Sequence, residues 1–541
     1  MKKCLLIPVL ATLIYACNAP LENADLLVFN ARVYTVDDNF SSADAFVVRS
    51  GKFIAVGSEA SLRNRYHAAQ EVDAAGKTIV PGFIDAHCHF YGLGQNQEVV
   101  NLIGTTSFDE VISRVVAFQD RAQGGFIYGR GWDQNDWKAK GFPDKTVLDS
   151  LFPNVPVALQ RVDGHALLVN QKALDLAGID GNTKVAGGAV ILKNGMPTGV
   201  LVDSPMQLVL AKWPKPDREA QIRGLLAAQR IGFENGLTTV NDAGIDRDVI
   251  ELIDSLHRTG DLSMRVYAMV SNSPENLDYY LSRSPLKTDR LSVRAIKVYA
   301  DGALGSRGAA LKAPYTDQPG HYGAMITEPK DLEALALRIA QAGYQMNTHA
   351  IGDSANIAVL RAYSAALKEI KDPRWKVEHA QILDTADLIH FSAKVLPSVQ
   401  PTHATSDMYW AQDRLGAGRM DGAYAFLSLL ERSGSIALGT DFPVEAVDPI
   451  QTFYAAVTRQ DQHGYPEGGF LPNQLLSREQ ALKGMTIWAA YSNFEENEKG
   501  SIAPGKWADF IMLSDNLMEA PPEKLKNIEV LQTFIGGHKV Y

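Results

Sequence analysis

The sequence has few cysteines and no excess of positive charge. Only three of its 541 residues are cysteine, and just Cys17 and Cys88 lie beyond the first 16 residues. If Cys17 is modified, no pair remains for an intramolecular disulfide. Lysine and arginine total 52 against 62 acidic residues, so the formal net charge is -10, and no basic cluster stands out. This balance argues against a nucleic-acid partner.

Several catalytic and structural patterns are also missing. We find no fixed-period repeat, no Ser/His/Asp nucleophile pattern and no glycine-rich loop of the kind that cradles phosphate. Hydrophobic residues make up 46% of the chain and charged residues 21%. This is ordinary globular composition, with enough apolar material for a large core.

The first residues have the pattern of a signal peptide. A lysine pair precedes an apolar run over residues 4–14, which is too short for a permanent transmembrane helix. Ala16, immediately before Cys17, resembles the end of the cleavage box of bacterial lipoproteins. We therefore expect a signal peptide at residues 1–16 and a lipid on Cys17. The lipid would anchor the protein in the bacterial cell envelope, facing the periplasm or the surface, and ordinary secretion is the alternative.

Strand-like runs near both chain ends predict a small β domain. Turn residues separate the runs, which span residues 26–29, 45–49, 53–56, 508–513 and 530–535. We predict a discontinuous β-sandwich built from residues 17–80 and 499–541. The larger domain then occupies residues 81–498.

The larger domain alternates strand-like runs with helical patterns. The runs span residues 78–87, 236–242, 264–270, 295–301, 345–349, 375–379, 396–403 and 436–441. Eight such units predict an α/β fold, a closed (β/α)8 barrel whose chemistry lies at the carboxyl ends of the strands. Residues from about 91 to 235 exceed one βα unit and predict a large insertion after strand 1 that helps to cover the barrel mouth. Later in the chain, Ser477 and Gln480 have the spacing of a helix capping box.

Histidines and an aspartate gather at the predicted strand tips. His87 and His89 are two residues apart, and an extended segment sends both imidazoles to the same side. His349, His379 and Asp441 end the fifth, sixth and eighth runs. Imidazoles and a carboxylate suit zinc, with manganese, iron and nickel as alternatives. Because four histidines exceed the needs of one open zinc site, we predict two divalent ions per chain.

Lys297 lies among apolar neighbours on the predicted fourth strand. If it faces inward, a buried ammonium beside metal ions is disfavoured. Loss of its proton and reaction with carbon dioxide would give a carbamate that bridges the metals. The alternative is a lysine at the barrel rim paired with Asp301, and the local sequence alone favours this alternative. Cys88 falls on the opposite face from its two neighbouring histidines, so we expect it in the core.

Longer motifs resemble a known family. PGFIDAHCH at 81–89 resembles the opening metal motif of the amidohydrolase superfamily. Further segments resemble its YtcJ-like branch, amidohydrolase family 3: IKVYADGALGSR at 296–307, NTHAIGD at 347–353, VEHAQ at 377–381, GTDFPV at 439–444 and GSIAPGKWAD at 500–509. The likeness covers nearly the whole chain after residue 16.

The resemblance implies a metal-dependent hydrolase with a two-metal site. By that resemblance, His87 and His89 hold the first metal, His349 and His379 hold the second, and carboxylated Lys297 bridges them. Asp441 contacts the first metal and the attacking water. A one-metal site without the carbamate is the alternative.

Such a centre predicts hydrolysis of an amide, or of a related non-peptide C–N bond, in a small molecule. Asp441 can accept the proton of the attacking water and return it to the departing nitrogen. Three residues are candidates for substrate binding: His165, whose segment DGH resembles a feature of the same branch, Arg307, and His403 at the tip of the seventh run. Each also has a purely structural interpretation, as a packed histidine or an arginine clamp.

Two other functions remain open. A one-metal aromatic deaminase shares the barrel and most ligands, but such enzymes place a glutamate shortly after the fifth-strand histidine. Here residues 350–353 read AIGD, which together with Lys297 favours hydrolysis. The second is a catalytically inactive, ligand-binding lipoprotein. An intact ligand set that includes a water-activating aspartate argues against it.

Overall fold

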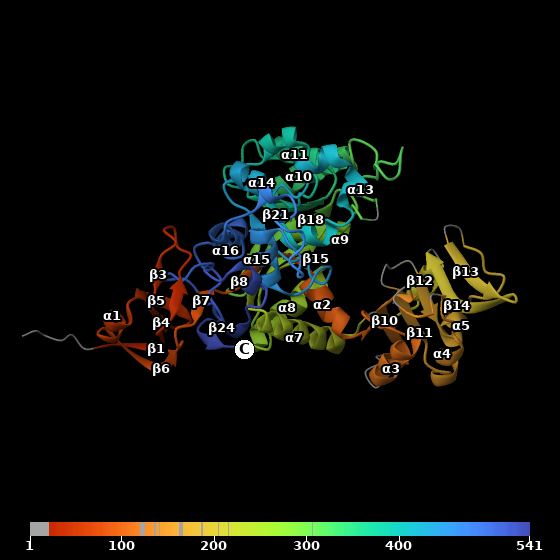
Figure 1. Ribbon diagram of the computed structural model, residues 1–541, viewed down its shortest axis with the longest axis horizontal. Coiled ribbons are helices and arrows are strands. Elements are labelled where there is room, and N and C mark those ends of the chain that lie inside the picture. Colours follow the sequence, from red (N-terminus) through yellow and green to blue (C-terminus); the bar gives the residue numbers. More distant parts are fainter. Residues whose placement is uncertain are drawn as a thin grey trace, which may run out of the picture.

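The computed structural model describes residues 21–119, 125–134, 137–139, 141–161, 166–185, 188–203, 205–214, 216–305 and 307–541. It contains a barrel, a β-sandwich and an insertion with its own sheet (Figure 1), which confirms the predicted fold class. The expected signal peptide and Cys17 lie outside the described residues, as does His165. In the described part of the chain, no helix is long and apolar enough to cross a membrane.

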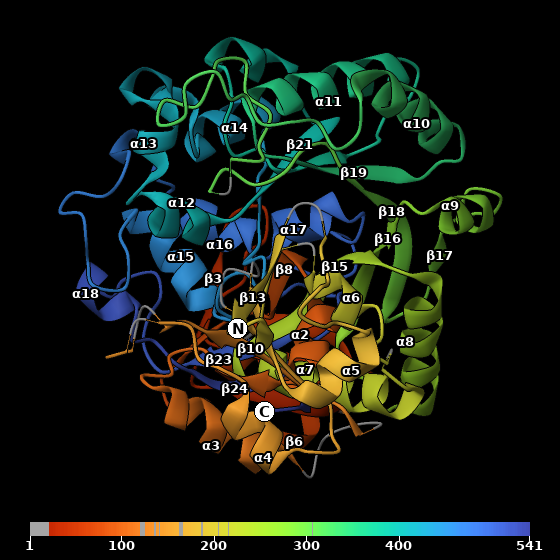
Figure 2. The same cartoon turned by 90° about the vertical axis from the view of Figure 1, so that its right-hand side faces the viewer.

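Eight parallel strands form the barrel in the spatial order β8, β15, β16, β18, β19, β20, β21, β22. They are β8 (Phe83–Cys88), β15 (Leu237–Ile245), β16 (Arg265–Ser271), β18 (Leu291–Tyr299), β19 (Gln345–Ala350), β20 (Trp375–His379), β21 (Val395–Val399) and β22 (Ala437–Leu438). The strands are buried almost throughout, because helices cover the outside. Figure 2 shows α8 (Arg247–Thr259), α10 (Pro329–Gln341) and α11 (Asp353–Ala366) in this outer layer.

The barrel closes through single hydrogen bonds between β8 and the segment that follows β22. The backbone N–H of Asp441 donates to the carbonyl of His87 at 2.8 Å, and the Thr440 hydroxyl donates to Asp85 at 2.7 Å. Gly439 is required here, because an added Cβ would lie 2.6 Å from the nitrogen of His87. The closure therefore brings the first and last predicted ligands side by side.

The helices show the local signals that the sequence carries. On α8, five apolar residues face the barrel at helical spacing, and Gly260 ends the helix in the left-handed conformation. On α16 (Arg478–Gly484), the Ser477 side chain accepts from the Gln480 backbone N–H, and the Gln480 side chain accepts from the Ser477 N–H. The predicted capping box is confirmed.

Both chain ends build the β-sandwich, as predicted. One sheet contains β1 (Glu22–Phe29), β4 (Ala45–Arg49), β5 (Lys52–Gly57) and β6 (Tyr66–Asp73). The other contains β2 (Arg32–Tyr34), β3 (Ser42–Ala43), β7 (Thr78–Pro81), β23 (Phe510–Leu513), β24 (Val530–Ile535) and β25 (His538–Lys539). Aromatic rings fill the space between them, with the Phe510 ring 4.8 Å from Phe46 and 4.3 Å from Phe534.

One predicted strand is wrong. The run at 78–87 was expected to be the first barrel strand, but the structure divides it between two sheets. Its first half, β7, pairs antiparallel with β23 in the sandwich, and its second half, β8, pairs parallel with β15 in the barrel. The division falls at Gly82, where a Cβ would lie only 2.3 Å from Thr238. Both halves are equally apolar, so hydrophobicity alone does not mark the boundary.

The insertion forms a six-stranded sheet in the order β13, β14, β12, β11, β10, β9. Its strands are β9 (Val100–Asn101), β10 (Ile127–Trp132), β11 (Val157–Arg161), β12 (Ala166–Val169), β13 (Gly188–Lys193) and β14 (Met196–Asp203). It connects to the barrel through α2 (Phe90–Gln97) and α7 (Arg218–Glu234), which cross closely at Gly94 and Gly224. Figure 1 shows it as a separate lobe beside the barrel. A role in covering the mouth stays a prediction.

A buried ion pair ties the sandwich to the barrel. Arg265, at the start of β16, donates two hydrogen bonds to Asp509, at 2.6 and 3.0 Å, and both side chains are at most 5% exposed.

We expect Asp509→Ala to lower the free energy of unfolding by about 3–5 kcal/mol, because it leaves the guanidinium buried and unpaired. Urea denaturation measures this. Glu519→Ala is the matched control, because its pair with Arg32 is largely exposed and should be worth at most about 1 kcal/mol. Equal losses in the two variants would contradict the assigned role.

Candidate metal centre

Six predicted ligands meet at the carboxyl ends of the barrel strands. They are His87 on β8, His89 just after it, Lys297 on β18, His349 on β19, His379 on β20 and Asp441 just after β22. His87 and Lys297 are almost completely buried, and His379 and Asp441 are each 5% exposed. His89 and His349 are more open to solvent, with side chains 31% and 15% exposed.

Close distances link these side chains into one cluster. Nζ of Lys297 lies 3.0 Å from Nε2 of His87. Oδ1 of Asp441 lies 3.2 Å from Nε2 of His89 and 3.6 Å from Nε2 of His87. The His379 ring lies 4.8 Å from His87 and 4.6 Å from His349. One donor atom each from His87, His379 and Asp441 falls within 4.8 Å of the others, which is close enough to hold one ion.

Hydrogen bonds behind the rings direct the histidines toward the centre. Nδ1 of His87 contacts Glu378 at 2.6 Å, Nδ1 of His89 contacts the carbonyl of Ala243 at 3.0 Å, and Nδ1 of His379 contacts Gln400 at 2.7 Å. Since each partner is an acceptor, Nδ1 carries the proton and Nε2 keeps its lone pair. These three rings are therefore fixed in the tautomer that binds a metal through Nε2.

Two of the ligands occupy an unusual backbone conformation. His379 has φ of 71° and Asp441 has φ of 63°. Residues other than glycine rarely adopt this left-handed region, and such strain is concentrated at functional sites. At His379 the conformation brings the ring to the same interior as the side chain before it, although successive residues of a regular strand point to opposite faces.

Burial favours the neutral forms of His349, His379 and Lys297. It lowers the pKa of His349 to about 3, with help from the charge of Lys297, and it lowers the pKa of His379 well below its ordinary value. Burial also lowers the pKa of Lys297, against the opposing charges of Glu378 and Asp441. Asp441 behaves oppositely, because the nearby His89 and His87 outweigh burial and hold its pKa well below the usual range. The cluster thus offers neutral nitrogens and one carboxylate, the donor set of a divalent transition metal.

Two buried polar atoms in the cluster lack hydrogen-bond partners among the described residues, as metal-binding atoms do. Nε2 of His349 and Oδ1 of Asp441 are buried and make no hydrogen bond with the described residues. Buried polar atoms in proteins rarely lack partners, and a bound ion is one of the accepted explanations. Both atoms belong to predicted ligands, so the donor set fits the expected divalent ion.

The structure rules out one of the two interpretations of Lys297. A lysine at the rim paired with Asp301 is wrong, because Lys297 is 1% exposed and faces His87. Asp301 instead accepts hydrogen bonds from three backbone N–H groups, those of Ala310, Ile351 and Gly352, at 2.8–2.9 Å. Its role is to hold the loops that follow β18 and β19.

The candidate substrate residues have different surroundings. His403 lies next to the cluster, with Nε2 3.6 Å from Oδ2 of Asp441. Its predicted place at a strand tip is wrong, because β21 ends at Val399 and His403 lies on α12 (Pro401–Asp407). Arg307 donates two hydrogen bonds to Asp317, which is the clamp-like arrangement. His165 lies outside the described residues.

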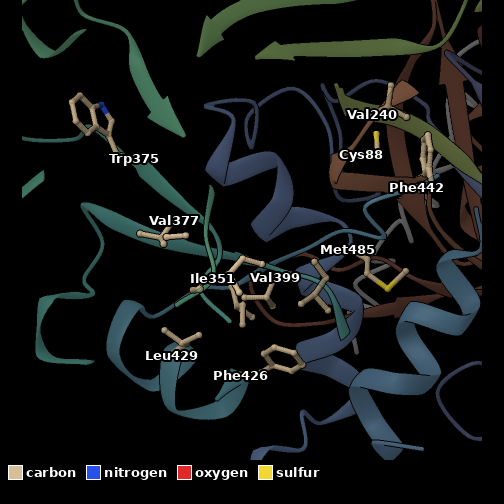
Figure 3. Close-up of a cluster of buried hydrophobic side chains, with 14 of the residues drawn as sticks. Cys88, Val240, Ile351, Trp375, Val377, Val399, Phe426, Leu429, Phe442 and Met485 are labelled. Carbon is tan, nitrogen blue, oxygen red and sulfur yellow. The ribbon is translucent and has the colours of Figure 1, made fainter. Parts of the chain in front are cut away.

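Cys88 lies in the core, as expected. It is fully buried, and Figure 3 shows it near Val240 and Phe442 in a cluster of hydrophobic side chains. Its thiol contacts the carbonyl of Asn241 at 3.4 Å. Burial raises the pKa of this thiol well above its ordinary value, which disfavours the thiolate that ligation or nucleophilic attack requires.

Sequence reasoning missed Glu378 and Gln400, the two side chains that orient His87 and His379. Glu378 lies in the VEHAQ segment and Gln400 in the run at 396–403. A single sequence does not show which histidine either side chain contacts. The alternation of β20 predicts that Glu378 and His379 point to opposite faces, and only the left-handed backbone at His379 reverses this.

A separate cavity of about 380 Å³ lies where the insertion joins the barrel. Its lining includes Tyr91 on α2, Gln221 on α7, and the aromatic residues Phe126, Tyr128 and Trp213. The predicted metal ligands do not line it. It is therefore distinct from the histidine cluster.

Comparison with known proteins agrees with this geometry. The model of the amidohydrolase family matches residues 70–541. The chain is 32% identical to the putative amidohydrolase YtcJ of Bacillus subtilis, over 94% of this chain and 98% of that protein. It is 26% identical to the N-substituted formamide deformylase of Arthrobacter pascens, over 95% and 97% of the two chains.

A solved structure gives the same result. An uncharacterized metal-dependent hydrolase from Pyrococcus horikoshii superposes with a TM-score of 0.78 at 26% identity, covering 92% of this chain and 99% of that one. The family model spans far more than half of the chain. The protein belongs to the amidohydrolase family and is a metal-dependent hydrolase.

Proposed function

We propose that this protein hydrolyses an amide, or a related non-peptide C–N bond, in a small molecule, with Asp441 as the proton acceptor. The observation that carries the proposal is the position of Asp441. Its Oδ1 faces His87 and His89, while its Oδ2 faces His403 at the mouth. One carboxylate thus lies between the predicted ligands and the side from which substrate arrives.

The predicted metals would be held by His87 and His89 on one side and by His349 and His379 on the other. We propose that they are zinc ions and that a carbamate on Lys297 bridges them. Nζ of Lys297 lies beside Nε2 of His87, and burial favours the neutral amine that reacts with carbon dioxide. When bound, such metals lower the pKa of water and polarise a carbonyl.

The protein's own residues then move the protons. Asp441 accepts a proton from the water whose oxygen attacks the carbonyl carbon. The C–N bond breaks, and Asp441 returns that proton to the departing nitrogen, which gives an amine and a carboxylic acid that retains the other proton of the water and ionises in solution. His403 is placed to donate a hydrogen bond to the oxygen on which negative charge develops. The similarity to an enzyme named N-substituted formamide deformylase supports N-formyl amides as the first class to test.

A substrate panel tests the proposal. Zinc-loaded protein should cleave at least one compound among formamides, N-acyl amino acids, dipeptides and cyclic amides, releasing an amine and a carboxylate detectable by mass spectrometry. Chelation should abolish the release. Ammonia release from aromatic amidines or nucleobases, without amide cleavage, would instead identify a deaminase. Tight binding of a ligand without turnover would identify an inactive binding protein.

A further inference from the structure

Glu378 is a fully buried carboxylate behind the predicted metal ligands. It lies on β20 one residue before His379 and is 0% exposed. Its Oε2 lies 2.6 Å from Nδ1 of His87, and its Oε1 makes no hydrogen bond with the described residues. Among the described residues, the Glu378 carboxylate therefore has His87 as its one hydrogen-bond partner.

The other oriented histidines have neutral acceptors. His89 donates to a backbone carbonyl and His379 to the amide oxygen of Gln400, at 3.0 and 2.7 Å. Only His87 among these three has an ionisable acceptor. A carboxylate behind an imidazole fixes the tautomer, as a neutral acceptor does, and in addition raises the electron density on Nε2.

A buried lysine lies near Glu378 on the same strand. Lys376 is completely buried, two residues before Glu378 on β20, and donates to Asn493 at 3.0 Å. A neighbouring cation partly offsets the cost of burying a carboxylate, which is large for an isolated charge.

We propose that Glu378 is a positioning residue that makes His87 the strongest nitrogen donor of the centre and so sets the affinity of the ion that His87 binds. The inference deepens the proposed function, since it rests on the same metal centre. Glu378 itself contacts neither the ion nor the substrate. It acts through the ring of His87.

Metal titration of folded protein tests this proposal without using activity. Metal-free wild type, Glu378→Gln and Glu519→Gln are titrated with zinc against a chromophoric chelator at 25 °C. We expect Glu378→Gln to weaken the tightest site by about 10- to 100-fold, although the amide is nearly isosteric and can still accept from His87. Glu519→Gln is the matched control, because it makes the same change at a carboxylate that is 66% exposed and pairs with Arg32. It should leave the affinity for zinc within a few-fold of wild type.

Two more measurements separate a positioning role from a structural one. The visible spectrum of the cobalt-loaded protein should shift in Glu378→Gln, because the field at the ion changes. Glu378→Asp keeps the charge and should retain more affinity than Glu378→Gln, even though its reach is shorter. The inference is overturned if Glu378→Gln keeps wild-type affinity and spectrum, or if the aspartate variant binds as weakly as the glutamine variant.

The same titration distinguishes this inference from the proposed function. If wild-type protein binds no divalent ion, there is no metal centre, and both the proposed function and the role of Glu378 are wrong. If wild type binds zinc tightly and Glu378→Gln binds it equally well, only the role of Glu378 is wrong. If Glu378→Gln does not fold, Glu378→Met removes the same charge, and a folded Glu378→Met variant with wild-type affinity and spectrum overturns the inference.

Discussion

Asp441→Asn is expected to lower turnover by about 10²- to 10⁴-fold while the fold is retained. The amide has nearly the same shape as the carboxylate but cannot accept the proton of the attacking water, and loss of general acid/base action has this typical magnitude. The backbone does not confound the test. Asparagine, like aspartate, tolerates the left-handed conformation that residue 441 adopts with φ of 63°.

The measurement is the rate on the best substrate of the panel, with metal content determined on the same sample. Metal analysis is needed because Asp441 is also a predicted ligand. Asp278→Asn is the matched control, since this carboxylate pairs with Arg338 and is 76% exposed. It should keep full activity. A metal-replete Asp441→Asn enzyme with the wild-type rate across pH would show that Asp441 is not the proton shuttle, and His165 or His403 would become the leading candidate.

The fold class could be predicted from the sequence because the pattern of a barrel strand followed by a helix repeats. Eight apolar runs, each followed by a helix, constrain the topology even where single boundaries are wrong. The run at 78–87 crosses the domain boundary that the sequence places between residues 80 and 81, but its division into two strands could not be predicted, because β7 and β8 are similarly apolar and only sheet pairing separates them. The end of β21 was missed although the sequence marks it, since Pro401 stands at the first position of α12, where proline is favoured.

The candidate site was predictable where spacing fixes geometry. His87 and His89 do approach a common atom, Oδ1 of Asp441, as two residues on one side of an extended segment should. The hydrogen bonds that orient the histidine rings could not be predicted from the sequence. Contacts such as that of Glu378 with His87 join residues 291 positions apart. No local pattern contains that information.

Local sequence also gave the wrong preference at Lys297. A lysine near an aspartate at a strand end is usually a rim pair, and Asp301 is four residues away. The structure shows instead that the backbone N–H groups of two loops occupy Asp301. Its carboxylate is therefore satisfied without a lysine, which leaves Lys297 to the barrel interior.

Lys297→Met is expected to remove one of the two predicted metals and to lower turnover by about 10³-fold. Methionine keeps the apolar stem but has no amine to form a carbamate, so the bridge between the ions is lost. A Lewis-acid metal contributes several kcal/mol of charge stabilisation in the transition state, and each 1.36 kcal/mol is about tenfold in rate. Elemental analysis of dialysed protein measures the first effect, and turnover on the identified substrate measures the second.

Lys499→Met is the matched control for this prediction. Lys499 is also buried, with its side chain 4% exposed, but its ammonium pairs with Glu495 at 2.9 Å and not with a predicted ligand. Its loss should leave the metal content unchanged. Bicarbonate gives an independent test, because wild-type protein reloaded with zinc should regain activity faster when bicarbonate is present, and Lys297→Met should not respond. If Lys297→Met keeps both ions and full turnover, no carbamate bridges the metals, and the one-metal alternative gains if wild type also holds a single ion.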